Sequence, residues 1–487
     1  MGKLISSRNN NNEISYFKAI LQGIAKDGGL FIPKKFNKID FYNKKLIDYN
    51  YHQFAFLILK SFLKDIPDDD LKQMIKNAYN NKFDTKEIVP IKKINDSFFI
   101  ELFHGPTLAF KDMALSILPY LMKYSKKEEN LNKDILILTA TSGDTGKAAL
   151  EGFKNIDGIK IIVFYPKDGV SEIQAKQMKT QTGKNVKVLG VDGNFDDAQN
   201  SVKEIFNDNK FKNKLLKQNY ILSSANSINI GRLLPQIIYY VSSYFKLIKK
   251  QEIDQGEKVN VVVPTGNFGN ILAAKYAKKL GLPIDKLICA SNENKVLTEF
   301  FNSGTYNINR SFKKTYSPSM DILISSNLER FLYHISNENS KEVNEFMLNL
   351  SKEKKYTIND KLKNEMEDFK GYFCSQKETL NTIKNVYDKY NYLIDPHTAV
   401  AYCCYKKSSK DKKTLIASTA HPFKFPKAIS KALNLKNNKN VFNLLEKLEK
   451  RTDTKIPKRI KNLTNKETIH NKTISIKNIR KNIISFL

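Results

Sequence analysis

The sequence predicts an α/β protein with two doubly wound, mainly parallel β-sheets. Short apolar runs alternate with helical segments through most of the chain, which is the pattern of a parallel sheet covered by helices on both faces. Two of the strand–helix pairs are joined by glycine-rich loops, at residues 139–146 and 264–270. At 487 residues, the chain is long enough for two or three domains with large cores.

The first 95 residues are predicted to form an N-terminal α/β unit with helices at 16–25 and 51–63. A strand at 97–101 then opens a larger region, 96–430, which contains a smaller subdomain at roughly 112–230. The alternating elements that follow are strands at 134–139, 159–165, 186–191 and 220–223, and helices at 147–154, 171–181, 196–206 and 231–249.

A second alternating series begins with a strand at 259–263, a helix at 270–280 and a strand at 287–290. Ligands bind at the carboxyl ends of such strands, so we expect a cleft between the two sheets. The stretch 302–370 is predicted to be helical with long loops, and it is followed by a helix at 393–405 and the last core strand at 414–419. The chain ends in a basic C-terminal extension, 431–487, which is predicted to contain a helix at 441–448 and a loose far tail.

Composition argues against several classes of function. Lysine and arginine outnumber aspartate and glutamate by 81 to 50, a net charge of +31. Such a surplus suits nucleic-acid phosphates, but the basic residues are spread along the chain and known nucleic-acid-binding motifs are missing. We interpret the charge as favouring solubility and the capture of anionic metabolites. No apolar run approaches the roughly 20 residues of a membrane span, and neither a membrane nor a cleavable signal is expected.

The cysteines and histidines are too scattered to suggest a disulfide framework or a metal site. The four cysteines are Cys289, Cys374, Cys403 and Cys404, and none has C-x-x-C spacing. The six histidines include no pair with metal-ligand spacing. The sequence therefore predicts no metal and a reducing compartment, the cytoplasm.

Lys111 lies in an unusually apolar setting for a lysine, with Ala109 and Phe110 before it and Met113 shortly after it. Burial disfavours the charged ammonium and leaves an amine that can attack a carbonyl group. Most lysines are solvated surface residues, so the segment alone does not identify a nucleophile. Because two loops suited to anions follow it, Lys111 becomes the candidate catalytic residue.

Both glycine-rich loops join a strand to a helix, where backbone amides bind anions. The first, Thr139-Ala-Thr-Ser-Gly-Asp-Thr-Gly146, adds hydroxyl groups but does not fit Walker A, since Ala148 stands where Ser or Thr is needed. In the second, Pro264-Thr-Gly-Asn-Phe-Gly-Asn270, Gly266 and Gly269 permit close approach of an anion and a positive φ. Taken singly, each loop also suits a plain helix-capping turn.

Four segments carry a family resemblance: His104-Gly-Pro-Thr-Leu-Ala-Phe-Lys-Asp112, Ala140-Thr-Ser-Gly-Asp-Thr-Gly146, Gly266-Asn-Phe-Gly-Asn270 and Ser418-Thr-Ala-His-Pro422. They resemble threonine synthase, an enzyme of the tryptophan-synthase-β fold group. Segments 25–33, 226–236 and 317–330 are similar to that family too, in the same order and up to about residue 430. The resemblance implies the pyridoxal-phosphate-dependent fold type II and the cofactor pyridoxal 5'-phosphate.

The resemblance also implies roles for individual residues. Lys111 would bind the cofactor covalently, and Thr419 would offer its hydroxyl to the pyridine nitrogen, with Ser418 as the nearest alternative. A neutral hydroxyl there makes the ring a weaker electron sink, which favours β/γ replacement chemistry over transamination. The cofactor phosphate would be held by Gly266, Asn267, Phe268, Gly269 and Asn270.

The implied substrate is O-phospho-L-homoserine, which reacts with water to give L-threonine and phosphate. Its carboxylate is expected at Thr141, Ser142, Asp144 and Thr145, with Asp144 near the cofactor's ring hydroxyl. Its phosphate is expected at Ser227, Asn229, Arg232 and Lys424. Phe423 stands where a smaller residue is usual, which bears on the shape of that pocket. For His421, packing and catalysis both stay open, whereas His104 is expected to orient its loop.

Other functions stay in view. A phospholyase would release phosphate without making threonine, and a serine/threonine dehydratase would act on the free amino acid. Dehydratases usually have a Ser-x-Lys segment, unlike Ala109-Phe-Lys111. A basic binding protein without pyridoxal phosphate is the distant alternative. A monomer or a homodimer is expected.

Overall fold

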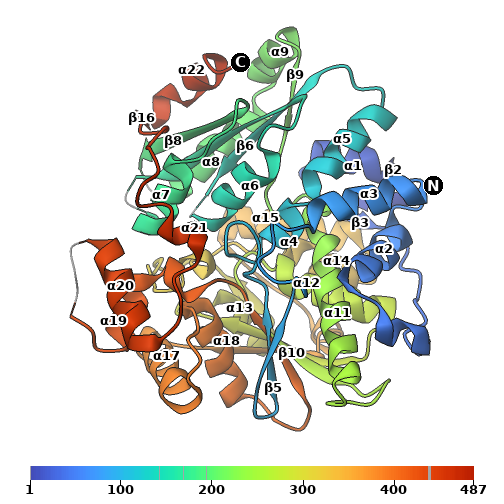
Figure 1. Ribbon diagram of the computed structural model, residues 1–487. Coiled ribbons are helices and arrows are strands. Elements are labelled where there is room, and N and C mark those ends of the chain that lie inside the picture. Colours follow the sequence, from blue (N-terminus) through green and yellow to red (C-terminus); the bar gives the residue numbers. More distant parts are fainter. Residues whose placement is uncertain (1, 142, 168, 194, 437–439) are drawn as a thin grey trace.

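The computed structural model describes residues 2–141, 143–167, 169–193, 195–436 and 440–487 (Figure 1). Two mainly parallel sheets lie in separate lobes, the small lobe at the top of Figure 1 and the large lobe below it. One apolar core cluster joins the N-terminal segment to both lobes, since it contains Leu4, Phe54, Ile137 and Val261. The predicted pair of parallel sheets is confirmed, and the domain boundaries near 95 and 430 stay a prediction.

The sheet of the small lobe has five parallel strands in the order β16-β8-β7-β6-β9. These strands are β6 (Asp134–Ala140), β7 (Ile159–Pro166), β8 (Val186–Asp192), β9 (Tyr220–Ser223) and β16 (Thr473–Ser475). The helices between them are α6 (Asp144–Phe153), α7 (Glu172–Lys179), α8 (Phe195–Asn207) and α9 (Asn209–Lys217). Strands β6 and β7 are buried on both faces, which explains their continuous apolar sequences. Helix α6 begins at Asp144 rather than at 147, so its first turn belongs to the glycine-rich loop.

The sheet of the large lobe has the order β14-β11-β10-β15-β5-β4, in which β4 and β5 pair antiparallel and the other neighbours pair parallel. Its strands are β4 (Ile91–Ile94), β5 (Ser97–Glu101), β10 (Val259–Pro264), β11 (Ile284–Ser291), β14 (Phe369–Phe373) and β15 (Thr414–Ser418). The helices that pack around it include α11 (Pro235–Lys249), α12 (Gly269–Leu280), α13 (Val296–Ser303), α17 (Gln376–Tyr390) and α18 (Pro396–Lys407).

The N-terminal segment forms a three-stranded antiparallel sheet, β2-β1-β3, and helices that pack on α11 and on α5 (Leu118–Glu128). Its elements are β1 (Lys3–Ser6), β2 (Asn9–Ser15), α1 (Tyr16–Gln22), β3 (Phe31–Pro33), η1 (Lys44–Asp48), α2 (Tyr51–Phe62) and α3 (Asp68–Ala78). Helix α1 ends earlier than predicted because Gly23, with φ of 74°, terminates it.

The stretch 302–370 differs in part from the expectation of helices and long loops, because it also contains strands. Its elements are β12 (Thr305–Asn307), η2 (Pro318–Met320), α14 (Leu328–Ile335), α15 (Ser340–Glu353), β13 (Lys355–Thr357), α16 (Asp360–Asn364) and the start of β14. Strands β12 and β13 pair antiparallel, although they are about 50 residues apart in sequence. Single strands of three residues have too little pattern to be recognised.

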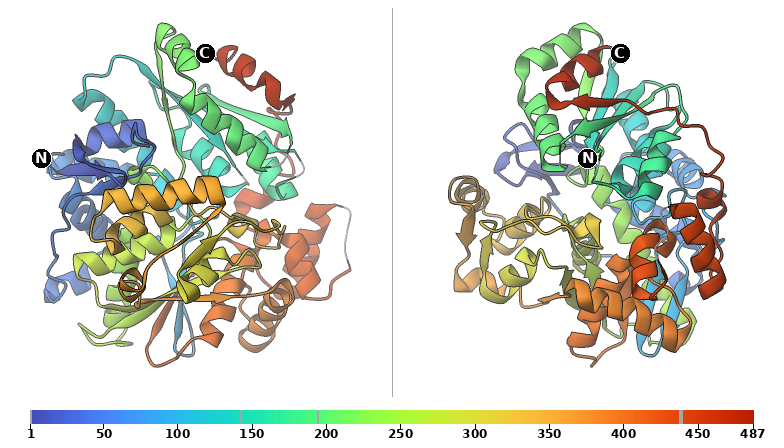
Figure 2. Two further views of the ribbon diagram at one scale, coloured as in Figure 1. Left: turned by 180° about the vertical axis from the view of Figure 1, so that it is seen from behind. Right: turned by 90° about the vertical axis from the view of Figure 1, so that its left-hand side faces the viewer.

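The far C-terminal tail is ordered, whereas the sequence suggested a loose one. Strand β16 pairs with β8 at the edge of the small sheet, and Ile479 and Ile483 of α22 (Ile479–Ile484) are buried against the same lobe. Figure 2 shows this red segment running from the large lobe to the small one. The remaining elements are α4 (Asp112–Leu115), α5 (Leu118–Glu128), α10 (Ile230–Leu233), η3 (Pro422–Lys424), α19 (Pro426–Ala432), α20 (Val441–Thr452), α21 (Lys458–Lys461) and η4 (Ile476–Asn478). Within the described chain, no helix combines the length and apolar character of a bilayer span.

Candidate active site

A cavity of about 1120 Å³ lies at the carboxyl ends of strands from both sheets. Its wall includes Thr141 after β6, Thr265 after β10 and Thr419 after β15. Parallel sheets bind ligands at this end because the strand ends and the following helix N-termini converge there. The expected cleft between the two sheets is therefore present, and both glycine-rich loops contribute to it.

Lys111 precedes the short helix α4 and lines this cavity. Its side chain is 10% exposed, and its Nζ lies 4.6 Å from the centre of the Phe110 ring and 3.9 Å from Asp144 Oδ2. Burial lowers the pKa of the Lys111 amine to about 8, although the Asp144 carboxylate opposes that shift. About a tenth of the amine is thus unprotonated at pH 7, against less than about a thousandth for an ordinary lysine, and the neutral amine is the form that a nucleophile requires.

Asp144 is the ionic partner that holds the two lobes together beside Lys111. Its Oδ1 accepts from Lys424 Nζ at 2.6 Å and from Gln174 Nε2 at 2.8 Å. Burial alone would raise the pKa of Asp144, but Lys424 and Lys111 hold it below its usual range, so the group is a carboxylate. Lys424 also donates to the Thr107 carbonyl at 2.8 Å and has no exposed surface. Its ammonium is thus engaged inside the protein, and it does not line the cavity as a phosphate ligand would.

The loop from Gly266 to Asn270 joins β10 to helix α12 and lines the cavity along its whole length. The first amides of a helix lack intrahelical acceptors, so the start of α12 offers a place for an anion. The positive φ expected of the glycines falls instead on Phe268, at 64°. The Phe268 ring packs against Phe301 and Phe331 in the core.

Residues 317–327, which we call the clamp segment, fix this loop from the other side. Ser325 Oγ donates to the Gly266 carbonyl at 2.6 Å, and Asn327 Nδ2 donates to the Asn267 carbonyl at 2.9 Å. A Cβ at Gly266 would lie only 2.6 Å from the Ser319 carbonyl oxygen. Glycine at 266 is therefore required by close contact with the clamp segment rather than by its own φ.

Two buried donors in the cavity wall have no partner within the described chain. Asn270 Oδ1 accepts from the hydroxyls of Tyr239, at 2.8 Å, and Tyr240, but Asn270 Nδ2 is unpaired. Arg232 donates from one terminal nitrogen to the Ala225 carbonyl at 2.7 Å, and its Nε is unpaired. Burial lowers the pKa of Arg232 to about 10, so it stays cationic at neutral pH. Unpaired buried donors are costly, so these two groups suit a bound ligand that carries acceptor oxygens.

The sequence matches known protein families along nearly the whole chain. Residues 3–79 match the family model "Threonine synthase N terminus", residues 91–419 match "Pyridoxal-phosphate dependent enzyme" and residues 398–477 match "Threonine synthase, C-terminal". The threonine synthase of Saccharomyces cerevisiae is 38% identical over 458 residues, covering 86% of this chain and 87% of the yeast protein. The chain belongs to the threonine synthase family. This confirms the predicted resemblance, the fold type II assignment and pyridoxal phosphate as the cofactor.

Solved structures of threonine synthases have the same fold. The pyridoxal-phosphate-bound enzyme of Brucella melitensis superposes with a TM-score of 0.89 at 33% identity, over 100% of this chain and 99% of that one. The yeast threonine synthase gives 0.87 at 35% identity, over 99% and 98%. Human "Threonine synthase-like 1" is 41% identical over 86% of this chain, and the chain spans 58% of the length of that relative.

The other predicted residues fall into two groups. Thr145, Ser227 and Thr419 line the cavity, as does Thr141, whose hydroxyl accepts from the Gly143 and Gly146 amides at 3.0 and 2.8 Å. Asn229 does not line it: the Asn229 amide donates to the Ile20 and Ser224 carbonyls and accepts from the Gly231 amide. Asn229 is thus the buried N-cap of α10, and its assignment to the substrate stays a prediction. Ser142 lies outside the described residues.

Ser418 and His421, which lie beside Thr419 and near Lys424 in sequence, make hydrogen-bonding contacts inside the protein. Ser418, the alternative to Thr419, is buried outside the cavity wall with its hydroxyl 3.1 Å from Thr398 Oγ1. His421 Nδ1 accepts from the amide of Phe423, which is itself fully buried, so the histidine caps the turn that carries Lys424. Burial lowers the pKa of His421 to about 3, which keeps it neutral at physiological pH.

His104 is held between two carboxylates, Asp84 at 2.6 Å and Glu101 at 2.9 Å. Burial would lower its pKa, but these two groups outweigh it and raise the pKa to about 9. His104 does not line the cavity. Its contacts agree with a role in orienting the loop before Lys111.

Several residues of the cavity wall were not predicted from the sequence. Arg8 lines it and forms two hydrogen bonds to Glu329, at 2.9 and 2.8 Å. His397 lines it too: its Nε2 accepts from the Ser319 amide at 3.2 Å, so its Nδ1 carries the proton given to Asp395 at 2.6 Å. Asp395 is the N-cap of α18, and the Asp-Pro-His sequence signalled this helix start without indicating that it faces a cavity.

Proposed function

We propose that this protein is a threonine synthase, which converts O-phospho-L-homoserine and water into L-threonine and phosphate. The observation that supports this best is Lys111, a buried amine with a lowered pKa. It lies in the wall of a cavity that also contains the start of α12 and Arg232, whose Nε is unpaired within the described chain. Phosphate is present twice in such a reaction, on the cofactor and on the substrate. The cavity wall contains donors that suit a phosphate group, at the start of α12 and at Arg232.

The cofactor is assigned to the glycine-rich loop of the large lobe. Lys111 would bind its aldehyde carbon covalently, and Thr419 would hydrogen-bond its ring nitrogen. Its phosphate would be held by Gly266, Asn267, Phe268, Gly269 and Asn270, with Asn270 Nδ2 gaining an acceptor. When bound, the cofactor supplies an electron sink for the carbanion formed at the substrate's Cα.

The chain's own groups then bind the substrate and move its protons. Thr141, Thr145 and Ser142 are assigned to the substrate carboxylate, and Arg232 with Ser227 to its phosphate. Lys111 would act as a base at Cα and as the proton carrier at Cβ, because its lowered pKa lets it both accept and donate a proton near neutral pH. The charge of the Asp144 carboxylate, fixed by Lys424, keeps the Lys111 ammonium oriented in the cavity.

We further propose a cytoplasmic location, because the four cysteines of the chain are free and buried. The substrate assignment is tested with purified protein loaded with pyridoxal phosphate and supplied with O-phospho-L-homoserine. We expect phosphate and L-threonine in equal amounts, measured by phosphate release and amino-acid analysis. Phosphate with 2-oxobutyrate would assign a phospholyase. No release, together with deamination of free serine or threonine, would assign a dehydratase.

A further inference from the structure

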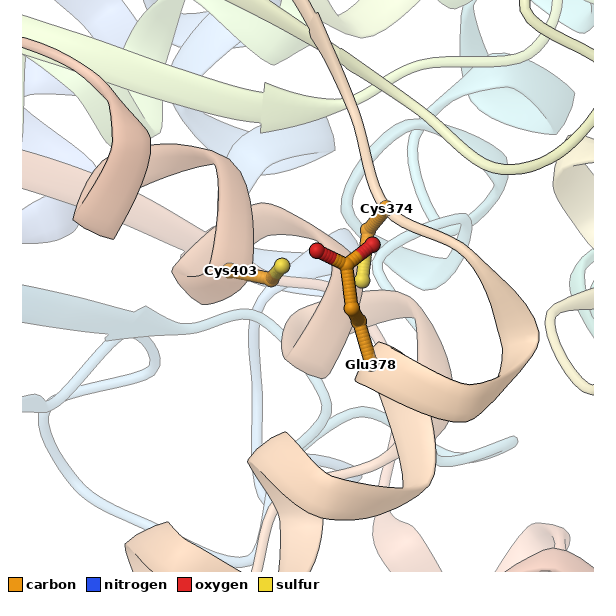
Figure 3. Close-up of side chains that lie close together, drawn as sticks. All are labelled: Cys374, Glu378 and Cys403. Atoms are coloured by element: carbon orange, nitrogen blue, oxygen red, sulfur yellow. The ribbon is translucent and has the colours of Figure 1, made fainter.

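Two cysteines and a glutamate come together between α17, α18 and the end of β14, outside the cavity wall (Figure 3). Cys374 follows β14, Glu378 lies in the first turn of α17, and Cys403 lies on α18. The two Sγ atoms and a carboxylate oxygen all lie within 4.8 Å of one another. Figure 3 shows the three side chains converging on the space between the two helices and the strand end. The mechanism proposed for Lys111 uses none of them.

The fold holds these positions firmly. The Cys374 amide donates to the Ser291 carbonyl at 2.9 Å, which ties the end of β14 to the end of β11. Ser375 is the N-cap of α17, and Glu378 completes a capping box by accepting from its amide at 2.8 Å. Both sulfur atoms belong to buried residues, and the Glu378 side chain is 41% exposed. The two cysteine side chains are thus shielded from water, whereas the glutamate carboxylate is accessible to it.

This set of atoms matches the ligands of a zinc-type ion. Zinc binds thiolate sulfur at about 2.3 Å in a tetrahedral arrangement, so two thiolates on one ion lie about 3.8 Å apart. The present separations, all within 4.8 Å, exceed that value by at most about 1 Å, and Cys374 Sγ would exchange its contact with Thr379 Oγ1 at 3.4 Å for the ion. Solvent at the exposed side of Glu378 would supply the fourth ligand as water.

Lys407 explains how the charges can balance. Its Nζ lies 2.7 Å from Glu378 Oε1, while Oε2 accepts from Ser375. Both members of this ion pair are substantially exposed, so separating them costs little. Oε1 can then bind the ion while Oε2 keeps the capping box, which orients the carboxylate as an outer hydrogen bond does in metal sites. Two thiolates and one carboxylate around a divalent cation leave one negative charge, and the Lys407 ammonium neutralises it.

We propose that Cys374, Cys403 and Glu378 form a structural binding site for a divalent zinc-class ion, with water as the fourth ligand. Binding releases the two thiol protons to solvent, and no electron is transferred. The ion would join β14 to α17 and α18. The cavity residue His397 lies in the first turn of α18, so the site would stiffen one wall of the cavity without touching the reacting atoms.

The test uses the full chain with its cofactor, stripped of adventitious metal and then supplied with Co²⁺ or Zn²⁺. We expect one Co²⁺ per chain with a thiolate-to-cobalt absorption band in the near ultraviolet, and displacement of that band by Zn²⁺. Cys374→Ser and Cys403→Ser should each abolish the band. Cys289→Ser, at a buried cysteine outside the cluster, should leave it unchanged.

Glu378→Gln keeps the proposal testable if a buried serine disturbs folding, because glutamine also completes a capping box. We expect this variant to fold normally and to bind the ion more weakly, by about tenfold or more. Absence of bound Co²⁺ and Zn²⁺ in the wild-type chain would overturn the proposal. So would a band that survives Cys374→Ser, or a count of titratable thiols that rises by two only after reduction, since Cys374 and Cys403 would then be joined as a disulfide.

Discussion

The two glycines of the cofactor loop should respond differently to alanine, although the sequence treats them alike. A Cβ at Gly266 would lie 2.6 Å from the Ser319 carbonyl oxygen, whereas such contacts are normally no closer than about 3.3 Å. The carbonyl or the loop must therefore move by about 0.7 Å. The carbonyl cannot move freely, because the Ser319 amide is bonded to His397 and the clamp segment is bonded to the loop. The expected cost is about 1–3 kcal/mol in the free energy of unfolding of the apo-protein.

Gly269 provides the matched control. Its added Cβ would meet Asn327 Nδ2 at 3.4 Å and Ser227 Cβ at 3.7 Å, which are ordinary contacts. It also lies at the first position of α12, where alanine is favoured over glycine by up to about 1 kcal/mol. Gly269→Ala should therefore leave the stability of the apo-protein unchanged or slightly raised.

Both variants are compared by urea unfolding of the apo-protein and by fluorescence titration with pyridoxal phosphate. If displacement of the loop also weakens cofactor binding by about 1–3 kcal/mol, Gly266→Ala should raise the dissociation constant for pyridoxal phosphate by about 5-fold to 150-fold. The reasoning is refuted if the two variants lose equal stability, or if Gly266→Ala unfolds like the wild type. A loss of affinity in Gly269→Ala without a loss of stability would instead report direct contact between the phosphate and that position.

Three further predictions concern the charges around Lys111. Because the pKa of Lys111 is lowered to about 8, the rate at which pyridoxal phosphate attaches to the apo-protein should rise with pH and level off above about pH 9. Stopped-flow absorbance measures this rate, and a continued rise toward pH 10.5 would mean that Lys111 is an ordinary lysine. Lys111→Ala should keep the fold, by circular dichroism, but lose turnover and the cofactor label fixed by borohydride; a label on another lysine would contradict the assignment. Lys424→Met should destabilise the protein by about 3–5 kcal/mol, because it leaves the buried Asp144 carboxylate without its closest partner. Lys427→Met removes one partner of the exposed ion pair with Glu172 and should lower the free energy of unfolding, measured by urea titration of both variants, by at most about 1 kcal/mol. Equal losses in the two variants would show that burial of the Lys424–Asp144 pair is unimportant.

The parts of the site that the sequence predicted are local in the chain. A strand, a glycine-rich loop and a helix are consecutive, so the loops at 139–146 and 264–270 and the parallel order of the strands could be inferred from pattern alone. The burial of Lys111 was predicted in the same way, because its apolar neighbours are adjacent to it in sequence. The family resemblance then added the cofactor and the fold type, which no pattern of strands specifies.

The parts that were missed depend on contacts between distant segments. Ser325 of the clamp segment contacts Gly266 across 59 residues, and Lys424 reaches Asp144 across 280. Nothing in the sequence around Lys424 tells a phosphate ligand from the partner of a buried carboxylate, because both are lysines in apolar surroundings. The convergence of Cys374 and Cys403 was hidden for the same reason, since each comes from a different element.

The edge position of β16 has a consequence for how the chain folds during synthesis. Strands β6 to β9 are complete by residue 223, but the strand that covers the edge of β8 is made only when residues 473–475 follow. While the second half of the chain is being translated, the backbone groups at the edge of β8 are unpaired. The apolar residues that later contact α22 face solvent during the same period. Exposed edges of this kind pair with other chains, so a nascent small lobe is a natural client for chaperones. Removing the last fifteen or so residues would make that temporary exposure permanent, and we expect a protein that accumulates as aggregates while its large lobe remains competent to fold.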